Sequence, residues 1–255
     1  MITQTDALHI SLRNELISYG AGVNSTAMII LLVNKGWRGP IVFSDTGAEW
    51  PETYCFIDYF ENEWLKPRGL EVVRLGGVWR RGKEAMPLID YCEDYRICPM
   101  AAYRWCTEKW KRKPLDRFAE SLGGGKYLVG IAADEWRRAK GLKYPLLDAG
   151  ITRQDCIKLI EAEGLNVPQK SGCYICPFQR KPQWYELWQR HPKLFERAAK
   201  LEELSTERRG EASHLRPGGE WTLREIEREF ESQIPMFDDA IMDRLQAYKP
   251  CICGL

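Results

Sequence analysis

The sequence predicts an α/β fold in which a parallel sheet carries helices on both faces, followed by a helical C-terminal region. Short apolar segments alternate with segments of helical spacing in the first half of the chain, as in a parallel sheet with crossover helices. A glycine-rich turn joins the first strand to the first helix, and polar residues follow later strands. Ligands of such sheets bind at these strand ends. With 255 residues, 44% of them hydrophobic, the chain can bury a sizeable core.

The predicted elements of this sheet follow one another in a regular order along the chain. We expect strands at 14–20, 40–43, 69–75 and 126–131. Helical spacing predicts helices over 25–34 and 52–64, the second with its aromatic residues on one face. Polar residues come directly after the second and fourth strands. After about Gly150 the sequence turns to helices rich in charge and tryptophan, which we assign to a separate C-terminal region.

Composition and net charge limit which functional classes and which cellular locations we expect for this protein. The net charge of +1 gives no overall attraction to nucleic acid, so any basic surface is local. The N-terminal residues lack the pattern of a signal peptide, and the apolar run Ala27–Val33 is too short to cross a membrane. We therefore expect a soluble, cytoplasmic protein with no membrane association. In a reducing compartment its nine cysteines favour metal binding, redox chemistry or burial over disulfides.

The turn after the first strand, Gly20–Thr26, has the composition of a phosphate-binding loop. Its small residues permit close backbone approach, and its polar residues offer side-chain donors at a helix start. The helix N-terminus adds free N–H groups and a favourable dipole for an anion. The lysine of a Walker-type loop is missing. Taken alone, the pattern also fits a glycine turn that only connects a strand to a helix.

Other motifs, in a fixed order, strengthen the nucleotide interpretation. They are GAGVNST (20–26), SDTGAEWPET (44–53), RWCTEKWKRKPL (104–115), GIAADEWRR (130–138), YPLLDAGITRQD (144–155), SGCYICPF (171–178) and a terminal CGL. Together they resemble the PP-loop ATP pyrophosphatase superfamily, of adenine nucleotide alpha hydrolase-like fold, and more narrowly its phosphoadenosine phosphosulfate (PAPS) reductase-like branch. The loop motif of that superfamily is S-G-G-x-D-S-T, so Gly20, Ala21 and Asn24 depart from it.

The resemblance implies a site residue by residue. It implies that the loop holds the phosphates of ATP or of an adenine sulfonucleotide, with the residues Gly20, Ala21, Gly22, Asn24, Ser25 and Thr26. Around it, the nucleotide would be contacted by Asp45, Thr46, Gly130, Asp134 and Glu135. Asp45 and Asp134 are the expected catalytic carboxylates, and Asp134 would bind Mg²⁺ or orient the substrate. Without the resemblance, Asp134 and Glu135 would suit a solvated helix start. We expect a PP-loop nucleotide-binding domain over residues 1–145 and a helical region over 146–255.

The cysteines form a second constellation. Cys173 and Cys176 have the C-x-x-C spacing with which two thiolates reach one metal or cluster. The resemblance implies a [4Fe-4S] cluster with the ligands Cys106, Cys173, Cys176 and Cys253. Zinc is the alternative metal, because four thiolates suit it equally. The reserve ligands are Cys98 and Cys251.

Cys253 has a second possible role. The ending CGL resembles the E-C-G-L-H of sulfonucleotide reductases, whose cysteine attacks sulfur. The flanking Glu and His are absent here.

Three segments interleave tryptophan with cations: residues 79–84, 104–113 and 136–143. Such segments can grip phosphates and stack bases, or can be ordinary helix surface. Our sequence-based hypothesis is an enzyme of sulfur metabolism that adenylates a substrate with ATP and releases pyrophosphate. Nucleic acid, as tRNA or DNA, is the expected acceptor, and cluster-assisted sulfur transfer from a donor protein would follow. The alternatives are a sulfonucleotide reductase that releases sulfite and a non-catalytic, metal-stapled binding module.

Overall fold

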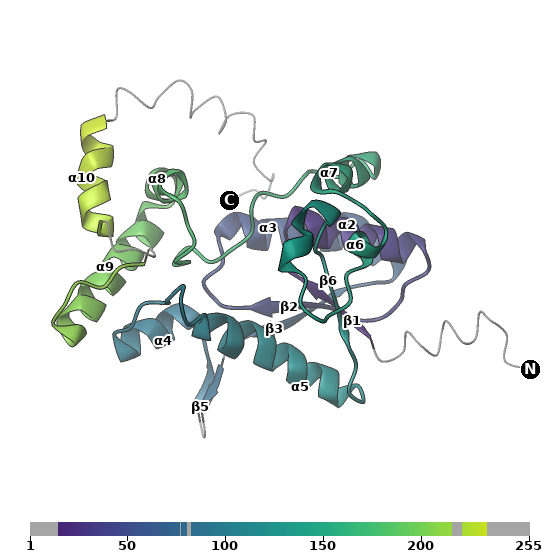
Figure 1. The fold of residues 1–255 in the computed structure, drawn as a ribbon, viewed down its shortest axis with the longest axis horizontal. Coiled ribbons are helices and arrows are strands. Elements are labelled where there is room, and N and C mark those ends of the chain that lie inside the picture. The colour runs from purple at the N-terminus through teal and green to yellow at the C-terminus, as the bar shows by residue number, and fades with distance from the viewer. Residues whose placement is uncertain (1–14, 77, 81–82, 216–220, 234–255) are drawn as a thin grey trace, which may run out of the picture. The chain divides into compact units, whose positions relative to one another are not determined.

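The computed structural model describes residues 15–76, 78–80, 83–215 and 221–233 (Figure 1). Contacts divide the chain into two compact units. The first consists of Met1–Gly77 and Lys109–Ser171, and the second of Val78–Glu108 and Gly172–Leu255. The segment 78–108 thus groups with the C-terminal helices, although the sequence suggested a single boundary after residue 145. That boundary stays a prediction. Cys253 and Cys251 lie outside the described residues.

The first unit is built on a four-stranded parallel sheet in the order β3-β2-β1-β6. Its strands are β1 (Leu16–Tyr19), β2 (Ile41–Asp45), β3 (Val72–Gly76) and β6 (Tyr127–Val129). Side chains alternate between the two faces, as the pleat requires. Ile17 and Phe43 belong to one hydrophobic cluster, whereas Leu16 and Val42 belong to another. The four predicted strands are therefore confirmed; β1, β3 and β6 are shorter than predicted, whereas β2 runs two residues further, to Asp45.

Helices cover both faces of this sheet, as predicted (Figure 1). The larger cluster packs against α2 (Val23–Asn34), α3 (Pro51–Phe60), α6 (Pro145–Asp148) and α7 (Arg153–Ala162). On the opposite face Leu115 and Ala119 of α5 (Lys113–Ser121) contact Leu16 and Val42. Burial on both faces explains why the strands are apolar along most of their length.

Several short helical segments complete this unit. The α-helix predicted over 52–64 ends at Phe60 and continues as the π-helix η1 (Glu61–Leu65) and the 3₁₀-helix η2 (Lys66–Arg68). Gly69 ends it with a φ of +72°, a left-handed conformation that glycine adopts without strain. The π-helix η3 (Thr107–Arg112) precedes α5, and the 3₁₀-helix η4 (Ala133–Arg138) follows β6.

The second unit is mostly helical. It contains α4 (Leu88–Tyr95), α8 (Lys181–Arg190), α9 (Pro192–Arg209) and α10 (Leu223–Gln233). It also contains an antiparallel pair, β4 (Val78–Arg80) with β5 (Lys83–Met86), that the sequence analysis missed because charged residues hide the alternation there. Across the described ranges, no helix combines the length and apolar character that a membrane span requires.

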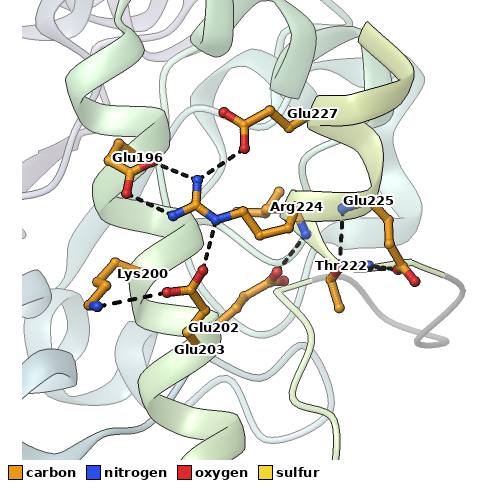
Figure 2. A network of polar contacts seen from close by, with 9 residues as sticks. Glu196, Lys200, Glu202, Glu203, Thr222, Arg224, Glu225 and Glu227 are labelled. Atoms are coloured by element: carbon orange, nitrogen blue, oxygen red, sulfur yellow. Dashed lines mark hydrogen bonds and ion pairs between the residues drawn. The ribbon is translucent and has the colours of Figure 1, made fainter. Parts of the chain in front are cut away.

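Two carboxylates of α9 organise the second unit (Figure 2). Glu202 is 4% exposed and accepts hydrogen bonds from the backbone N–H groups of Leu215 and Leu223, each at 2.6 Å. Burial raises the pKa of this carboxyl. Next to it, Glu203 accepts from Arg224 of α10 at 2.8 Å, and that guanidinium also pairs with Glu196. The network joins α10 to α9 through charge-assisted bonds.

We expect Glu202→Gln to destabilise the second unit. The amide keeps the shape of the side chain but offers one acceptor oxygen, so the N–H of Leu215 or of Leu223 loses its partner. An unsatisfied buried donor costs about 1–3 kcal/mol. Urea unfolding would measure this loss, with Glu207→Gln as the control. Glu207 is an exposed partner of Arg96 at 3.7 Å, and its change is expected to stay within about 0.5 kcal/mol. Equal stability of both variants would contradict this role of Glu202.

Candidate functional site

The loop Gly20–Thr26 connects β1 to the start of α2 at the carboxyl edge of the sheet. Ala21 has a φ of +53°, in the left-handed region that favours glycine. Gly22 is the N-cap residue of α2 and has no side chain with which to cap the helix. The first turn of α2 carries no acidic residue. The positive end of α2 is therefore left available to an anion.

Ser25 closes the loop upon itself. The backbone N–H of Gly22 donates to Ser25 Oγ at 3.2 Å, and that hydroxyl donates to the carbonyl oxygen of Gly22 at 3.0 Å. Thr26 is fully buried, with its hydroxyl 3.5 Å from that of Tyr19. Thr26 was expected to contact phosphates, but its side chain faces the core. The backbone amides of the first turn of α2 remain as the groups that could donate to an anion.

Gly130 lies against the same loop. A Cβ atom at this position would lie 2.7 Å from both the backbone nitrogen and the Cα atom of Ser25, closer than real Cβ contacts. Only glycine therefore permits the end of β6 to approach the first turn of α2. Gly130 was expected to contact the nucleotide. The structure shows it as the residue at which the end of β6 packs against the start of α2.

Asn24 links the loop to the residues that follow β6. Its side chain is 7% exposed, and its Nδ2 donates to Glu135 Oε2 at 2.7 Å. Its Oδ1 accepts from Arg153 Nη1 at 3.4 Å. Asp134 Oδ1 accepts the backbone N–H of Arg153, the first residue of α7, at 2.9 Å. The predicted residues Asn24, Asp134 and Glu135 are thus held together around the start of α2.

Asp45 ends β2, the strand next to β1. Its Oδ1 accepts from the Tyr54 hydroxyl and from the backbone N–H of Gly47, both at 2.7 Å. Burial, together with the adjacent Asp45, raises the pKa of Tyr54, so this phenol stays a donor. Thr46 is 2% exposed and donates to Glu49 Oε1 at 3.0 Å, so its hydroxyl is used inside the protein. The carboxylate of Asp45 is the better-placed group at this strand end.

Three contributors to the site were missed by the sequence analysis: Tyr54, Lys111 and Arg153. Lys111 Nζ pairs with the buried Glu49 at 3.0 Å, and Arg153 contacts Asn24 from α7. Each comes from an element distant in sequence from its partner or lies within an ordinary helical pattern. Sequence spacing carried no sign of these contacts.

The arrangement suits a phosphate chain bound with Mg²⁺. Magnesium is usually held by one or two carboxylates together with substrate phosphates. Within the described residues, Asp45 and Asp134 each keep one carboxylate oxygen that accepts no hydrogen bond. These carboxylate oxygens are suitable ligands for Mg²⁺, whose remaining ligands would come from substrate phosphates and water.

Among the described residues, the cysteines predicted as cluster ligands do not gather at one site. Cys106, Cys173 and Cys176 all belong to the second unit. Yet in the part of the chain that is described, no three His, Cys, Asp or Glu side chains gather to hold a metal ion. The three described cysteines thus do not by themselves make a metal site, and Cys253, the fourth expected ligand, lies outside the described residues, so the cluster and its zinc alternative stay predictions. The described cysteines form no disulfide with one another.

Cys98, expected as a reserve metal ligand, is buried and hydrogen-bonded. It is 4% exposed, and its thiol donates to the carbonyl oxygen of Leu201 in α9 at 3.8 Å. Burial raises the pKa of Cys98 to about 12, whereas a metal ligand is a thiolate. Cys92 and Cys156 are fully buried, as expected of packed thiols, and burial raises the pKa of Cys156 to about 11.

Comparison with known proteins assigns the chain to a family. Residues 14–154, more than half of the chain, match the phosphoadenosine phosphosulfate reductase domain. The chain is 26% identical over 188 residues to an uncharacterised nin region protein of Escherichia phage lambda, covering 63% of this chain and 64% of that protein. It is 32% identical over 146 residues to a phosphoadenosine 5′-phosphosulfate reductase of Buchnera aphidicola, covering 54% and 53%.

A solved PAPS reductase of Candida auris, in a phosphate complex, superposes with a TM-score of 0.45 and 13% identity over 68% of this chain and 96% of that one. The chain spans between about half and two thirds of the length of the two curated relatives. The family match covers β1, the loop Gly20–Thr26, Asp45, η4 and the start of α7. The chain therefore belongs to the phosphoadenosine phosphosulfate reductase domain family, as the resemblance of its motifs predicted.

Proposed function

We propose that this chain is a nucleotide-binding enzyme of sulfur metabolism that uses ATP with Mg²⁺ to adenylate an acceptor and releases pyrophosphate. One observation carries the proposal. The N-terminus of α2, whose N-cap residue Gly22 has no side chain, lies at the carboxyl edge of the sheet together with Asp134, which keeps one oxygen for a cation, in a domain of this family. A triphosphate needs both an anion site and a cation to offset its charge.

Each residue of the site would have a separate role. Amides at the start of α2 would bind phosphate oxygens, while Asp45 and Asp134 would hold Mg²⁺, which screens charge on the leaving pyrophosphate. Arg153 would orient the phosphate chain from the side of α7. An acceptor oxygen then attacks the α-phosphorus, the bond from that phosphorus to the bridging oxygen breaks, and pyrophosphate leaves with the electron pair. The acceptor proton passes to solvent or to a carboxylate at the loop.

Sulfur enters in a second step that the described residues do not supply. A sulfur atom at the sulfide level, delivered by a donor protein, would attack the adenylated carbon or phosphorus and displace AMP. Because the described cysteines do not gather as ligands, we assign no part of this step to a cluster. We assign the activating step to the chain.

A second candidate is the reduction of an adenine sulfonucleotide. The family and the Buchnera aphidicola relative carry the name of that activity. In this reaction a cysteine, here Cys253, would attack sulfur and no cation would be needed. The carboxylates at the loop favour the first candidate, since they suit a metal-bound triphosphate better than a bare anion.

We predict pyrophosphate release from ATP by anaerobically purified protein. The assay would supply ATP, Mg²⁺, total tRNA and single-stranded DNA, and would measure labelled pyrophosphate. A parallel assay with PAPS and a thiol reductant would measure sulfite, and we expect none. Sulfite without pyrophosphate would establish the second candidate instead. An absence of ATP binding by calorimetry, without sulfite formation and with zinc alone in metal analysis, would favour a non-catalytic binding module.

We predict that Asn24→Asp weakens ATP binding and that a second change restores it. The carboxylate introduced by this change cannot donate to Glu135, and two carboxylates would face one another beside the loop. The loss of a hydrogen bond to a charged group corresponds to a roughly 10- to 100-fold weaker affinity. The double variant N24D/E135Q returns a donor to the pair and keeps one carboxylate, so its affinity is expected to lie within several-fold of the wild type.

A matched control lies at the other end of the same helix. Asn34 Nδ2 donates to Glu163 Oε1 at 2.8 Å, in the same kind of pair but exposed and far from the loop. Asn34→Asp should leave ATP affinity unchanged. If N24D and N34D behave alike, or if N24D/E135Q fails to recover, the pairing of Asn24 with Glu135 does not shape the nucleotide site.

A further inference from the structure

The three segments in which tryptophan alternates with cations differ in how exposed their side chains are. The side chains of the first, residues 79–84, lie outside the described part of the chain. In the second, Trp110 is fully buried and Lys111 is paired with Glu49 at 3.0 Å, so this segment serves packing. In the third, Trp136 is 59% exposed. An indole that open to solvent has a face available for stacking.

The third segment also concentrates positive charge. Residues 133–143 contain more cations than carboxylates, in a chain whose net charge is +1. Both carboxylates are already hydrogen-bonded, since Asp134 accepts from α7 and Glu135 bonds Asn24 and Arg138. Arg137 lies over the Trp136 ring at 5.4 Å, and neither Arg137 nor Lys140 has an ion-pair partner among the described residues. Their charges are available to an anionic partner.

The third segment follows directly on the residues of the proposed nucleotide site. Trp136 follows Glu135, whose carboxylate bonds Asn24 of the phosphate loop at 2.7 Å. Both residues belong to η4, which leaves the sheet at the end of β6 next to β1. Trp136 is therefore one residue along the chain from the carboxylate that bonds the loop.

We propose that Trp136, Arg137, Arg138 and Lys140, here called the Trp136 platform, bind a single-stranded nucleic acid as the acceptor of the site. The proposal rests on the proposed function, whose acceptor it identifies. One base stacks on the indole while the guanidinium and ammonium groups contact the phosphates on either side. This pairing of an aromatic face with cations is how sequence-tolerant single-strand sites are built.

The geometry favours an unpaired strand over a duplex. A base must expose its face to stack on Trp136, and in a duplex both faces are covered by neighbouring bases. A few cations at one short helix also provide fewer phosphate contacts than duplex recognition employs. We therefore expect tRNA loops, or single-stranded DNA, to bind more tightly than double-stranded DNA.

The test is fluorescence anisotropy with a short labelled single-stranded DNA, on the full chain and without ATP. We expect Trp136→Ala to weaken binding roughly 5- to 150-fold, the range for one base–aromatic stack. Trp136→Phe keeps a stacking face and should retain most of the affinity. In R137Q/K140Q the slope of log affinity against log salt should fall by about 0.7 for each phosphate that the variant no longer neutralises.

The control is Tyr103→Ala, which removes another exposed aromatic ring, 74% exposed, from the second unit. It should leave strand binding unchanged. Calorimetric titration with ATP and Mg²⁺ should give wild-type affinity for every platform variant, which also shows that they fold. Wild-type binding of the strand by W136A, or tighter binding of the duplex, would overturn the platform. Failure of the wild type to bind any strand while ATP still binds would overturn it and leave the nucleotide site standing.

Discussion

The close packing of Gly130 against Ser25 holds the candidate site together. It brings the end of β6 to the first turn of α2, and a single added carbon would push them apart. From this contact the rest follows. η4 starts three residues after Gly130, at Ala133, and from it Glu135 bonds Asn24 and Asp134 bonds the start of α7. The contact thus places the loop next to Asp134, Glu135 and Arg153, whereas Asp45 is held separately by Tyr54 and Gly47 at the end of β2.

The departures of the loop from the superfamily motif fit this packing. Asn24 stands where the motif has Asp, and its amide is needed as a donor because Glu135 already places a carboxylate there. Ala21 adopts a left-handed conformation that glycine would adopt with less strain. The site thus keeps one carboxylate beside the loop but supplies it from η4 instead of from α2. A carboxylate beside the loop is thus retained, although Glu135 provides it and Asn24 takes the motif position of Asp.

Much of this could be predicted from sequence because it is local. Alternating apolar strands and helical spacing located the four strands and both faces of the sheet, and the loop residues were recognised from their order. The pairs Asn24–Glu135 and Tyr54–Asp45, and the close approach of Gly130, depend on three-dimensional packing that no spacing shows. The β4–β5 pair carries too much charge to display the alternation of a strand. Cysteine spacing likewise suggested a ligand set, although spacing alone does not place thiols around one ion.

Hydrogen–deuterium exchange with and without ATP and Mg²⁺ would test most directly whether the start of α2 binds the phosphates. Amide protons that donate to phosphate oxygens exchange slowly. The result predicted is slower exchange at Gly22–Thr26 and at residues 130–135, with no change in α9 or α10. Unchanged exchange at the loop under saturating nucleotide, or protection confined to the second unit, would contradict the assignment of this loop as the nucleotide site.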